Sequence, residues 1–277
     1  MADQLLDFTG KVVLVTGGST GIGRATSLAF ARQGATVVIG DVDERSAKTV
    51  ELIEQAGGTG LFVRTDVSAA SEVEALVRTA VESFGGLHVA FNNAGVLPPT
   101  APLAEMGEAE WDKIITVDLK GVFLSLKYEI AHMLTGGGGA IVNTASVAGV
   151  IADPGMAPYV AAKHGVVGLT RAAAIDYAKH GIRVNALAPG LVETPMTKRW
   201  LEDPAMRETV DRRLADGTPI ANSAATRKRL RMSRTISAID IPAWPPCPWP
   251  CACSARSAAA WSCAGASRPS SASGSQT

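Results

Sequence analysis

The sequence predicts an α/β fold in which a doubly wound, parallel sheet is covered by helices on both faces. Short apolar segments alternate with longer amphipathic ones from residue 12 to about residue 189, which is typical of repeated strand–helix–strand units. The apolar segments are continuous, as in strands that are buried on both faces. Glycine or polar residues follow most of them, at the edge of the sheet where such folds bind ligands. These three observations predict both the fold class and the place of its site.

The expected elements follow one another along a single domain, residues 1–220. We expect strands at 12–17, 36–41, 61–67, 87–95, 140–145 and 183–189. We expect helices at 21–34, 44–56, 71–85, 109–134 and 159–179. Gly34 is a suitable end for the first helix, and Ser71 is a suitable N-terminal cap for the third.

A glycine-rich turn, Gly17-x-x-x-Gly21-x-Gly23, joins the first strand to the first helix. Glycines here allow a tight turn and let a pyrophosphate approach the backbone N–H groups at the start of a helix. A plain connection would also use glycine, but the strand before it and the helix after it favour a nucleotide site. Thr20 and Ile22, inside the turn, would then lie against the nucleotide.

Asp41 ends the second expected strand, 18 residues after Gly23. A carboxylate at this point can accept both hydrogen bonds from the diol of an adenosine ribose, and it would repel a 2′-phosphate. Thr20 adds no positive charge that could hold such a phosphate, so the sequence favours NAD over NADP. Arg45 could weaken this preference, and Asp41 could instead cap the helix that follows.

Tyr159 and Lys163 are the main candidates for chemistry. Their spacing of four places both side chains on one face of the last expected helix, and Pro158 suits its first position. Ionising a tyrosine at pH 7 costs about 4 kcal/mol, and a cation ~4 Å away at an effective dielectric of about 20 returns a similar amount. Ser146 ends the preceding strand and could add a hydroxyl. The alternative is a half-buried tyrosine beside a solvated lysine, because Y-x-x-x-K also occurs by chance.

Further polar turns follow other strands at the same edge of the sheet. They are Asp66-Val67 after the third strand, Asn92-Asn93-Ala94-Gly95 after the fourth, and Pro189-Gly190 with Val192 and Thr194 after the sixth. Each turn alone is more typical of structure than of function. Their shared position at the ligand-binding edge makes them candidates for cofactor contacts.

Charge and composition argue against several other functions. Residues 1–220 hold 19 basic and 25 acidic residues and no cysteine, which gives no basis for binding nucleic acid or an anionic membrane, or for a disulfide framework. The basic run 226–234 is more typical of a solvated segment. The four histidines share no spacing suited to a metal, so we expect no metal site. No signal peptide or membrane span is expected, and we predict a cytoplasmic protein.

Together these motifs resemble the short-chain dehydrogenase/reductase family. The matching segments, in the order and spacing of the family, are TGGSTGIG (16–23), Asp41, DV (66–67), NNAG (92–95), Ser146, YVAAK (159–163) and PG with Thr194 (189–194). The resemblance covers about residues 8–220. It implies a Rossmann-like domain that transfers a hydride reversibly between NAD(P) and an alcohol or carbonyl. Weaker similarity in 127–130, 143–149 and 163–174 indicates the branch that acts on sugars or cyclic alcohols.

The resemblance also implies a role for each matching residue. Tyr159 would be the acid/base, Ser146 would hold the substrate oxygen, and Lys163 would bind the nicotinamide ribose and lower the pKa of the tyrosine. Asn93 and Gly95, with Ala94 between them, would line the cofactor. Thr194 would hold its carboxamide.

The family further implies a homotetramer or homodimer. The helices 109–134 and 159–179 would pair between subunits, and small residues would let them approach. These residues are Ala161, Ala162, Gly165 and Gly168.

Asp118 departs from the family, which has asparagine at this position. That asparagine supports a water-linked proton relay to the lysine, through a local distortion of the helix. Asp118 can still accept hydrogen bonds, but it adds a charge and lacks the donor. We therefore expect a lower rate or an altered pH profile.

The second departure is an atypical tail, residues 221–277. Seven basic residues, one acid and all four cysteines fall in it, and the prolines of 242–250 exclude a helix or central strand there. We expect either a frameshifted C-terminus or a natural disordered extension. An intact family ending in another reading frame of the gene would support the first.

The sequence thus predicts an NAD-dependent oxidoreductase acting on a small secondary or cyclic alcohol or ketone. The alternative is a protein that binds NAD without turnover, because Asp118 and the tail impair it.

Overall fold

The structure, a computed structural model, describes residues 6–202 of the 277-residue chain. The expected domain boundary near residue 220 and the atypical tail lie outside these residues.

The strands of the described part form one parallel sheet, in the order β3-β2-β1-β4-β5-β6. They are β1 (Val12–Thr16), β2 (Thr36–Asp41), β3 (Thr59–Arg64), β4 (Val89–Asn92), β5 (Gly139–Thr144) and β6 (Ile182–Leu187). The chain moves outward from β1 to β3, returns to β4 and then continues to β6. The reversal between β1 and β4 is the point at which sheets of this kind bind ligands at their carboxyl edge.

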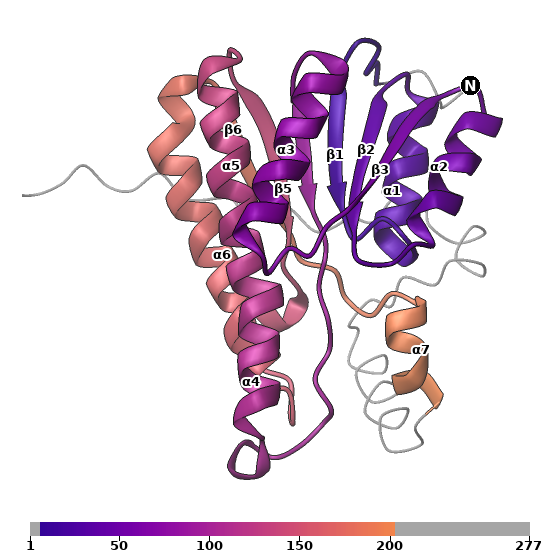
Figure 1. The fold of residues 1–277 in the computed structure, drawn as a ribbon. Helices are drawn as coiled ribbons and strands as arrows, with labels where there is room; N and C mark the ends of the chain where they lie inside the picture. The colour runs from indigo at the N-terminus through magenta and orange to yellow at the C-terminus, as the bar shows by residue number, and fades with distance from the viewer. Residues whose placement is uncertain (1–5, 203–277) are drawn as a thin grey trace, which may run out of the picture. The chain divides into compact units, whose positions relative to one another are not determined.

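Helices cover both faces of this sheet (Figure 1). They are α1 (Gly21–Arg32), α2 (Ser46–Gln55), α3 (Ala70–Phe84), α5 (Gly121–Thr135) and α6 (Ala157–Tyr177). Two other helices, α4 (Glu108–Ile114) and α7 (Pro195–Glu202), lie beyond the carboxyl edge of the sheet and do not cover its faces. Short helical turns are η1 (Leu103–Glu105), η2 (Ile115–Lys120), η3 (Val147–Gly149) and η4 (Ala178–His180). The Rossmann-like α/β fold expected from the sequence is confirmed.

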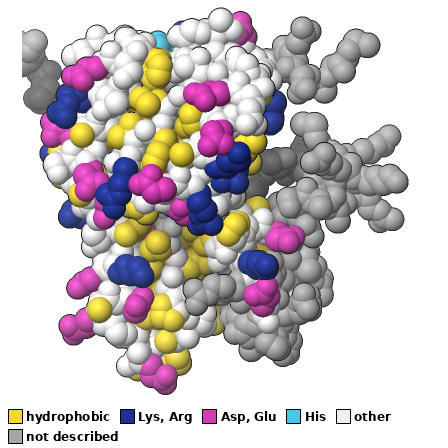
Figure 2. Space-filling model, turned by 45° about the vertical axis from the view of Figure 1, so that its right-hand side comes forward, with side chains coloured by type: hydrophobic (Ala, Val, Ile, Leu, Met, Phe, Trp, Pro, Cys, Tyr) yellow, Lys and Arg dark blue, Asp and Glu magenta, His cyan; other side chains and the backbone are white. Residues whose placement is uncertain are grey.

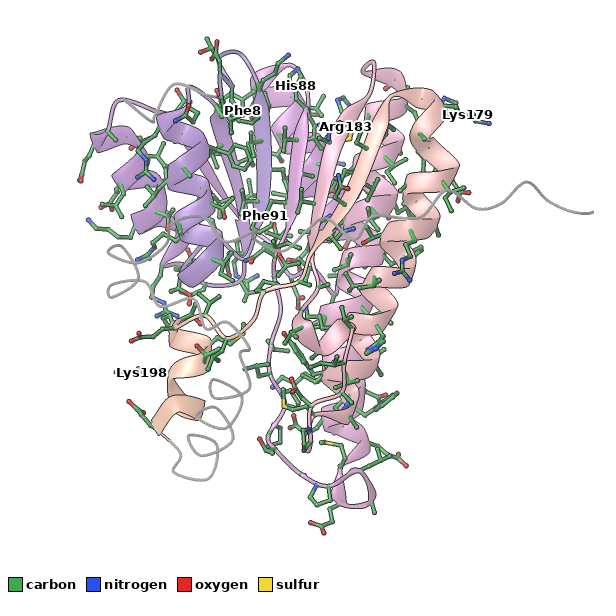
Figure 3. The ribbon with its side chains drawn as sticks, turned by 180° about the vertical axis from the view of Figure 1, so that it is seen from behind. Phe8, His88, Phe91, Lys179, Arg183 and Lys198 are labelled. Atoms are coloured by element: carbon green, nitrogen blue, oxygen red, sulfur yellow. The ribbon has the colours of Figure 1, made fainter. Side chains whose placement is uncertain are left out.

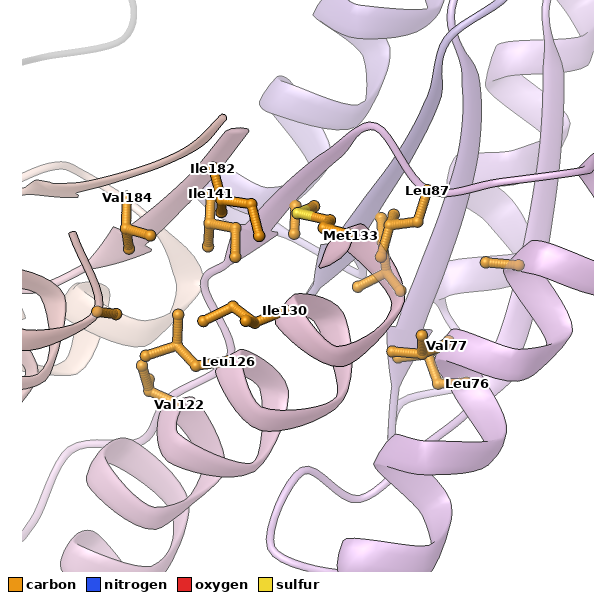
Figure 4. Packing of buried hydrophobic residues seen from close by; sticks show 14 of the residues in the cluster. Leu76, Val77, Leu87, Val122, Leu126, Ile130, Met133, Ile141, Ile182 and Val184 are labelled. Carbon is orange, nitrogen blue, oxygen red and sulfur yellow. The ribbon is translucent and has the colours of Figure 1, made fainter. Parts of the chain in front are cut away.

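The side chains of β1 pack alternately into two separate hydrophobic cores, one on each face of the sheet, because successive side chains of a strand point to opposite faces. Val13 and Val15 lie in a cluster with residues of α1 and α2. Val12 and Leu14 lie in a larger cluster with residues of α3, α5 and α6. Figure 4 shows the part of this second cluster in which Ile130 and Met133 of α5 approach strands β5 and β6. Apolar burial on both faces therefore fixes the sheet and the edge that carries the site.

Most expected elements are present, with boundaries shifted by one to three residues. Gly34 does follow the end of α1, with a positive φ of 86°. Ser71 does not cap α3: the helix begins at Ala70, and Ala69 takes the cap position without a side-chain hydrogen bond. Pro158 is the second residue of α6 rather than its first. Helix α7 was not anticipated.

The long helix expected at 109–134 is interrupted. Residues Ile115–Lys120 form a π-helix between α4 and α5. Such bulges are rare and occur frequently at functional sites. Asp118 lies within it, so the local distortion inferred from the family is present.

The surface of the described residues bears mixed charge. Figure 2 shows acidic and basic side chains interspersed over one face, with apolar side chains between them. No helix within residues 6–202 is long and apolar enough to cross a membrane.

Candidate functional site

A cleft of about 360 Å³ opens at the carboxyl edge of the sheet. Residues at or just after the ends of all six described strands line it: Gly17 follows β1, Asp41 ends β2, Asp66 follows β3, Asn93 follows β4, Ser146 follows β5 and Pro189 follows β6. The strand order thus places the two aspartates toward one end and Ser146 toward the other. The cleft is within the volume range of small-molecule sites.

The glycine turn at the start of α1 is held very close to the strands. A Cβ atom on Gly23 would lie 2.0 Å from the carbonyl oxygen of Gly17, and one on Gly17 would lie 2.8 Å from the Cα atom of Ala94. Only glycine fits these positions without moving backbone. The turn therefore brings the uncapped start of α1, where Thr20 makes no side-chain cap, to the cleft.

Asn93 secures this turn. Its amide nitrogen donates to the carbonyl oxygens of Thr16 (3.3 Å) and Gly17 (3.2 Å). The hydroxyl oxygen of Thr16 accepts hydrogen bonds from the backbone N–H groups of Asn93 and Ala94. Asn93 lines the cleft as expected, but its amide group is committed to holding β1 and β4 together beneath the glycine turn.

Asp41 is 8% exposed, and its carboxylate is oriented by backbone donors. It accepts hydrogen bonds from the N–H groups of Ser19 (2.9 Å) and Asp43 (3.0 Å). Arg45, which could have attracted a phosphate, instead pairs with Asp43 through several hydrogen bonds. The end of β2 therefore presents a fixed negative charge beside an arginine that already has an anionic partner.

Tyr159 and Lys163 lie one turn apart on α6, beside Ser146. The Nζ atom of Lys163 is 5.4 Å from the centre of the Tyr159 ring. Ser146 precedes η3, where its hydroxyl oxygen accepts a hydrogen bond from the N–H group of Ala148. All three catalytic candidates line the same cleft.

Lys163 is 3% exposed and has two oxygen partners. Its Nζ atom donates to the carbonyl oxygen of Thr144 at 3.0 Å. It also forms an ion pair with Asp118, 3.2 Å from the carboxylate atom Oδ2. The ammonium is thus held between β5 and the π-helix.

Asp118 is fully buried. Its atom Oδ1 accepts a hydrogen bond of 2.8 Å from the N–H group of Val96. Burial raises the pKa of the Asp118 carboxyl, and the Lys163 ammonium and the Val96 N–H group oppose that shift.

The same charges act on the other members of the site. Burial lowers the pKa of Lys163, but the carboxylate of Asp118 and the phenol of Tyr159 outweigh it, and the pKa is raised. Burial also raises the pKa of Tyr159; Lys163 and a hydrogen bond with Ser146 lower it, while Asp118 raises it further. Lys163 thus acts in the expected direction, but the net shift of the tyrosine is upward, opposite to the sequence-based expectation.

The cleft brings together every predicted site residue except Gly23, which lies beneath the turn. The predicted residues in its wall are Gly17, Thr20, Gly21, Ile22, Asp41, Asp66, Val67, Asn93, Ala94, Gly95, Asp118, Ser146, Tyr159, Lys163, Pro189, Gly190, Val192 and Thr194. Their roles in catalysis or cofactor binding remain predictions. No cluster of three His, Cys, Asp or Glu side chains suited to a metal is present within residues 6–202.

Sequence reasoning missed several residues of the cleft wall. Ser19 lies inside the segment TGGSTGIG (16–23) and Thr144 inside the segment 143–149, so these segments carry the signal for both residues. Thr197 gave no such signal. Its hydroxyl accepts from the N–H group of Thr194 at 3.0 Å and donates to the carbonyl oxygen of Val192 at 2.6 Å. It therefore shapes the loop that leads into α7.

The residues present fit a nicotinamide dinucleotide. The close glycine turn leaves room for a pyrophosphate at the uncapped start of α1, where backbone N–H groups and the helix dipole favour an anion. Asp41 offers acceptor oxygens for a ribose diol. The Lys163 ammonium, which carries three N–H donors, would bind the second ribose.

Comparisons with known proteins agree with this geometry. A family model described as short chain dehydrogenase matches residues 11–205. The cyclohexanol dehydrogenase of Acinetobacter sp. (strain SE19) is 44% identical over 196 residues, which are 70% of this chain and 78% of that protein.

Solved structures match in the same way. The crystal structure of levodione reductase has a TM-score of 0.70 and 40% identity, and the match covers 74% of this chain and 82% of that one. The carveol dehydrogenase from Mycobacterium avium, solved in complex with NAD, has a TM-score of 0.67 and 34% identity, covering 68% and 73%.

Proposed function

The chain belongs to the short-chain dehydrogenase/reductase family, and on that premise we propose that it transfers a hydride between NAD and a small secondary or cyclic alcohol or the matching ketone. Its family makes it a dehydrogenase or reductase with a nicotinamide cofactor. The choice of NAD, the role of Tyr159 and the class of substrate are the parts that we propose. The observation that supports them best is the cleft itself, which runs from Asp41 to the group of Ser146, Tyr159 and Lys163.

Tyr159 is proposed to exchange the proton of the reaction. In the oxidation, the phenolate of Tyr159 accepts the proton of the alcohol O–H group, and the carbonyl double bond forms as the hydride leaves the carbon. In the reduction, the phenol returns that proton to the oxygen. The hydroxyl of Ser146 donates a hydrogen bond to the same oxygen. The cofactor, when bound, supplies the hydride acceptor or donor.

NAD is proposed because of the charges at the end of β2. The carboxylate of Asp41 would repel the extra phosphate of NADP, at an energy of several kcal/mol if the charges lay about 4 Å apart at an effective dielectric of about 20. Lys163 is the one cation among the described residues that line the cleft, and it belongs to the opposite end. Arg45 is engaged by Asp43.

A neutral substrate is proposed because the described wall of the cleft is acidic. Its charged residues are three aspartates, Asp41, Asp66 and Asp118, and one lysine, Lys163. Since Asp118 pairs with Lys163, no free cation remains in this wall to bind a carboxylate or phosphate on the substrate. The apolar residues of the cleft wall include Val96, Val192 and Met196, which suit an apolar ring. The name cyclohexanol dehydrogenase, given to one relative, is consistent with this class.

A panel of alcohols and ketones tests the proposal. We expect NADH to form from NAD and a cyclic secondary alcohol, with much weaker activity on hydroxy acids and with NADP. Replacing Tyr159 by phenylalanine should lower kcat/KM by about 10²- to 10⁴-fold and leave NADH binding, followed by its fluorescence, nearly unchanged. Tyr177→Phe is the matched control, because this tyrosine ends the same helix outside the described wall of the cleft.

The alternative function, NAD binding without turnover, gives a different result in the same experiment. NADH would bind to the parent protein, but no substrate of the panel would be converted. Full activity of Tyr159→Phe would instead refute the role of Tyr159.

We also propose a homotetramer or homodimer built on η2, α5 and α6. An apolar groove lies on their outer face, lined by Ile115, Leu119, Phe123 and Leu169 among others, and Phe123 is 48% exposed. Gly168 lies on the exposed side of α6, and a Cβ atom added to it would meet no other atom within 4 Å. A second copy of this chain would cover that face.

The small residues of α6 divide into two groups. Ala161 and Gly168 are exposed, as a subunit contact requires. Ala162 is buried within the chain, and a Cβ on Gly165 would lie 2.7 Å from a methyl carbon of Leu119. Sedimentation of the full chain tests the assembly: Gly168→Arg should shift it to smaller species, and a monomeric parent protein would refute the proposal. The cytoplasmic location remains a prediction, to be tested by cell fractionation.

A further inference from the structure

The ion pair of Asp118 and Lys163 is the least expected feature of the site. Their side chains are 0% and 4% exposed, and the charged atoms lie 3.2 Å apart. Removing two charges from water is costly unless each stabilises the other. A buried pair at the reactive end of a cleft therefore requires an explanation beyond packing.

The backbone around Asp118 is shaped to hold this pair. The π-helix Ile115–Lys120 carries the carboxylate into the interior. A Cβ on Gly95 would lie 3.0 Å from the Oδ2 atom of Asp118, so glycine leaves the carboxylate the space it occupies. The N–H group of Val96 fixes the other oxygen at 2.8 Å. Two elements, the turn after β4 and the π-helix, thus converge on one carboxylate.

We propose that Asp118 is a positioning residue that holds Lys163 in a neutral ion pair, so that the site works at more alkaline pH than Lys163 alone would set. This inference rests on the proposed function, in which Tyr159 exchanges the substrate proton. With asparagine at this position the lysine would present a net positive charge to the phenol. With Asp118 the phenol faces a pair whose charges cancel.

The size of the effect follows from the distances. Nζ of Lys163 lies 5.4 Å from the ring centre of Tyr159 and 3.2 Å from Oδ2 of Asp118, which places Oδ2 within about 9 Å of the ring centre. A unit charge at about 9 Å, at an effective dielectric of about 20, changes an ionisation equilibrium about 20-fold. Removing the charge of Asp118 should therefore increase the tyrosinate fraction of Tyr159 about 10- to 30-fold at a fixed pH below its midpoint.

Other groups that face Tyr159 do not replace this effect. Lys163 and the hydroxyl of Ser146 lower the pKa of the phenol, while Asp118 and Asp153 raise it. Asp153 precedes α6 and would act equally in the parent and in an Asp118 variant. The difference between the two proteins thus reports the charge of Asp118, acting on Tyr159 directly and through the pKa of Lys163, which Asp118 raises.

The test is a spectroscopic titration of Tyr159 in the full chain without cofactor. The chain has three tyrosines, so subtracting the ultraviolet titration of Tyr159→Phe from that of its parent isolates this one. We expect Asp118→Asn to move the titration of Tyr159 about one unit or more toward acid. In turnover assays, the pH profile of alcohol oxidation should move by the same amount and in the same direction.

Two controls separate charge from structure. Glu129→Gln removes another buried carboxyl, on α5, which is not among the groups that shift Tyr159, so the titration should stay in place. Asp118→Leu removes both the charge and the acceptor of the Val96 N–H group, whereas asparagine keeps the acceptor. NADH should therefore bind Asp118→Asn as tightly as the parent within about threefold, and Asp118→Leu more weakly.

The outcomes distinguish this inference from the proposed function. An unshifted or alkaline-shifted Tyr159 in a folded Asp118→Asn protein would overturn the inference, even if the parent turned over alcohols. An acid shift in a protein without turnover would support the inference and reject the function. If Asp118→Asn does not fold, the pH profile of the parent decides instead: a tyrosine-dependent limb at or below neutral pH would overturn the inference.

Discussion

Replacing the buried Glu129 by glutamine should stabilise the protein at pH 8 and change its stability little near pH 4.5. Glu129 lies on α5 and is 0% exposed. Its atom Oε2 accepts a hydrogen bond of 2.9 Å from the Nδ2 atom of Asn92. Its other oxygen, Oε1, has no hydrogen-bond partner within the described residues. Ionising this carboxyl is therefore costly.

The magnitude follows from the pKa. Burial raises the pKa of Glu129 from 4.5 to about 7, and the hydrogen bond from Asn92 only partly opposes this. Because the folded pKa is the higher one, the folded protein keeps a proton that the unfolded chain loses. Stability is full below about pH 4.5 and falls as the pH rises to about 7. A shift of about 2.5 units corresponds to a loss of about 3 kcal/mol, which stays constant above that pH.

Glutamine keeps the shape of the side chain and does not ionise. Its oxygen can accept the bond from Asn92, and its NH₂ group adds a donor where Oδ1 of Asn92 also lacks a partner within the described residues. At pH 8 the free energy of unfolding of Glu129→Gln should exceed that of the parent by up to about 3 kcal/mol. At pH 5 the difference should be below about 1 kcal/mol.

Urea denaturation followed by circular dichroism, at several pH values from 5 to 8, measures this difference. Glu82→Gln is the matched control, because the side chain of Glu82 is 70% exposed on α3 and should give no pH-dependent gain. A stability difference between Glu129→Gln and the parent that does not grow from pH 5 to 8, or a Glu129→Gln protein that is less stable at every pH, would refute the reasoning.

Three further predictions concern the cleft and the opposite edge of the sheet. Gly23→Ala should lower NADH affinity at least about tenfold, since its Cβ would lie 2.0 Å from the carbonyl oxygen of Gly17; unchanged binding in fluorescence titrations would contradict the close-turn geometry. Asp41→Ser should reduce the ratio of NADPH to NADH dissociation constants about tenfold or more, and an unaltered ratio would remove the argument for NAD. His88, at the amino edge in Figure 3, accepts a hydrogen bond of 3.0 Å from the N–H group of Val12 through Nδ1. Burial lowers the pKa of His88 below 6.5, so its contribution to the free energy of unfolding should be full above pH 6.5 and should fall in acid. The loss should be no more than about 1 kcal/mol for this partly exposed ring. In urea titrations, His88→Gln should remove this pH dependence.

Local sequence patterns were sufficient to predict the strands and the ends of several helices. The continuous apolar segments predicted the strands within a few residues, most directly for β1 and β2, which are buried along almost their whole length. Gly34 was expected at the end of the first helix and follows α1 with a positive φ, a conformation in which glycine carries little cost. Ser71 does not cap α3 because it is the second residue of the helix, two positions after Ala69, which takes the cap position.

The site could be predicted as a set of residues, because each one follows a strand and the carboxyl ends of parallel strands share an edge. Its electrostatics could not. The spacing of Tyr159 and Lys163 predicts proximity, and Lys163 does lower the pKa of the phenol. The desolvation that outweighs it depends on everything packed around the ring.

The sequence by itself determined the fold class, the family and the residues that gather at the carboxyl edge. These depend on periodicity and on short motifs, which are local properties of the chain. Only the tertiary structure decided that Asp118 meets Lys163 and that Glu129 is buried beside Asn92. In both contacts the pKa of the carboxyl depends on its burial, and burial is set by the packing of the whole domain rather than by any one segment.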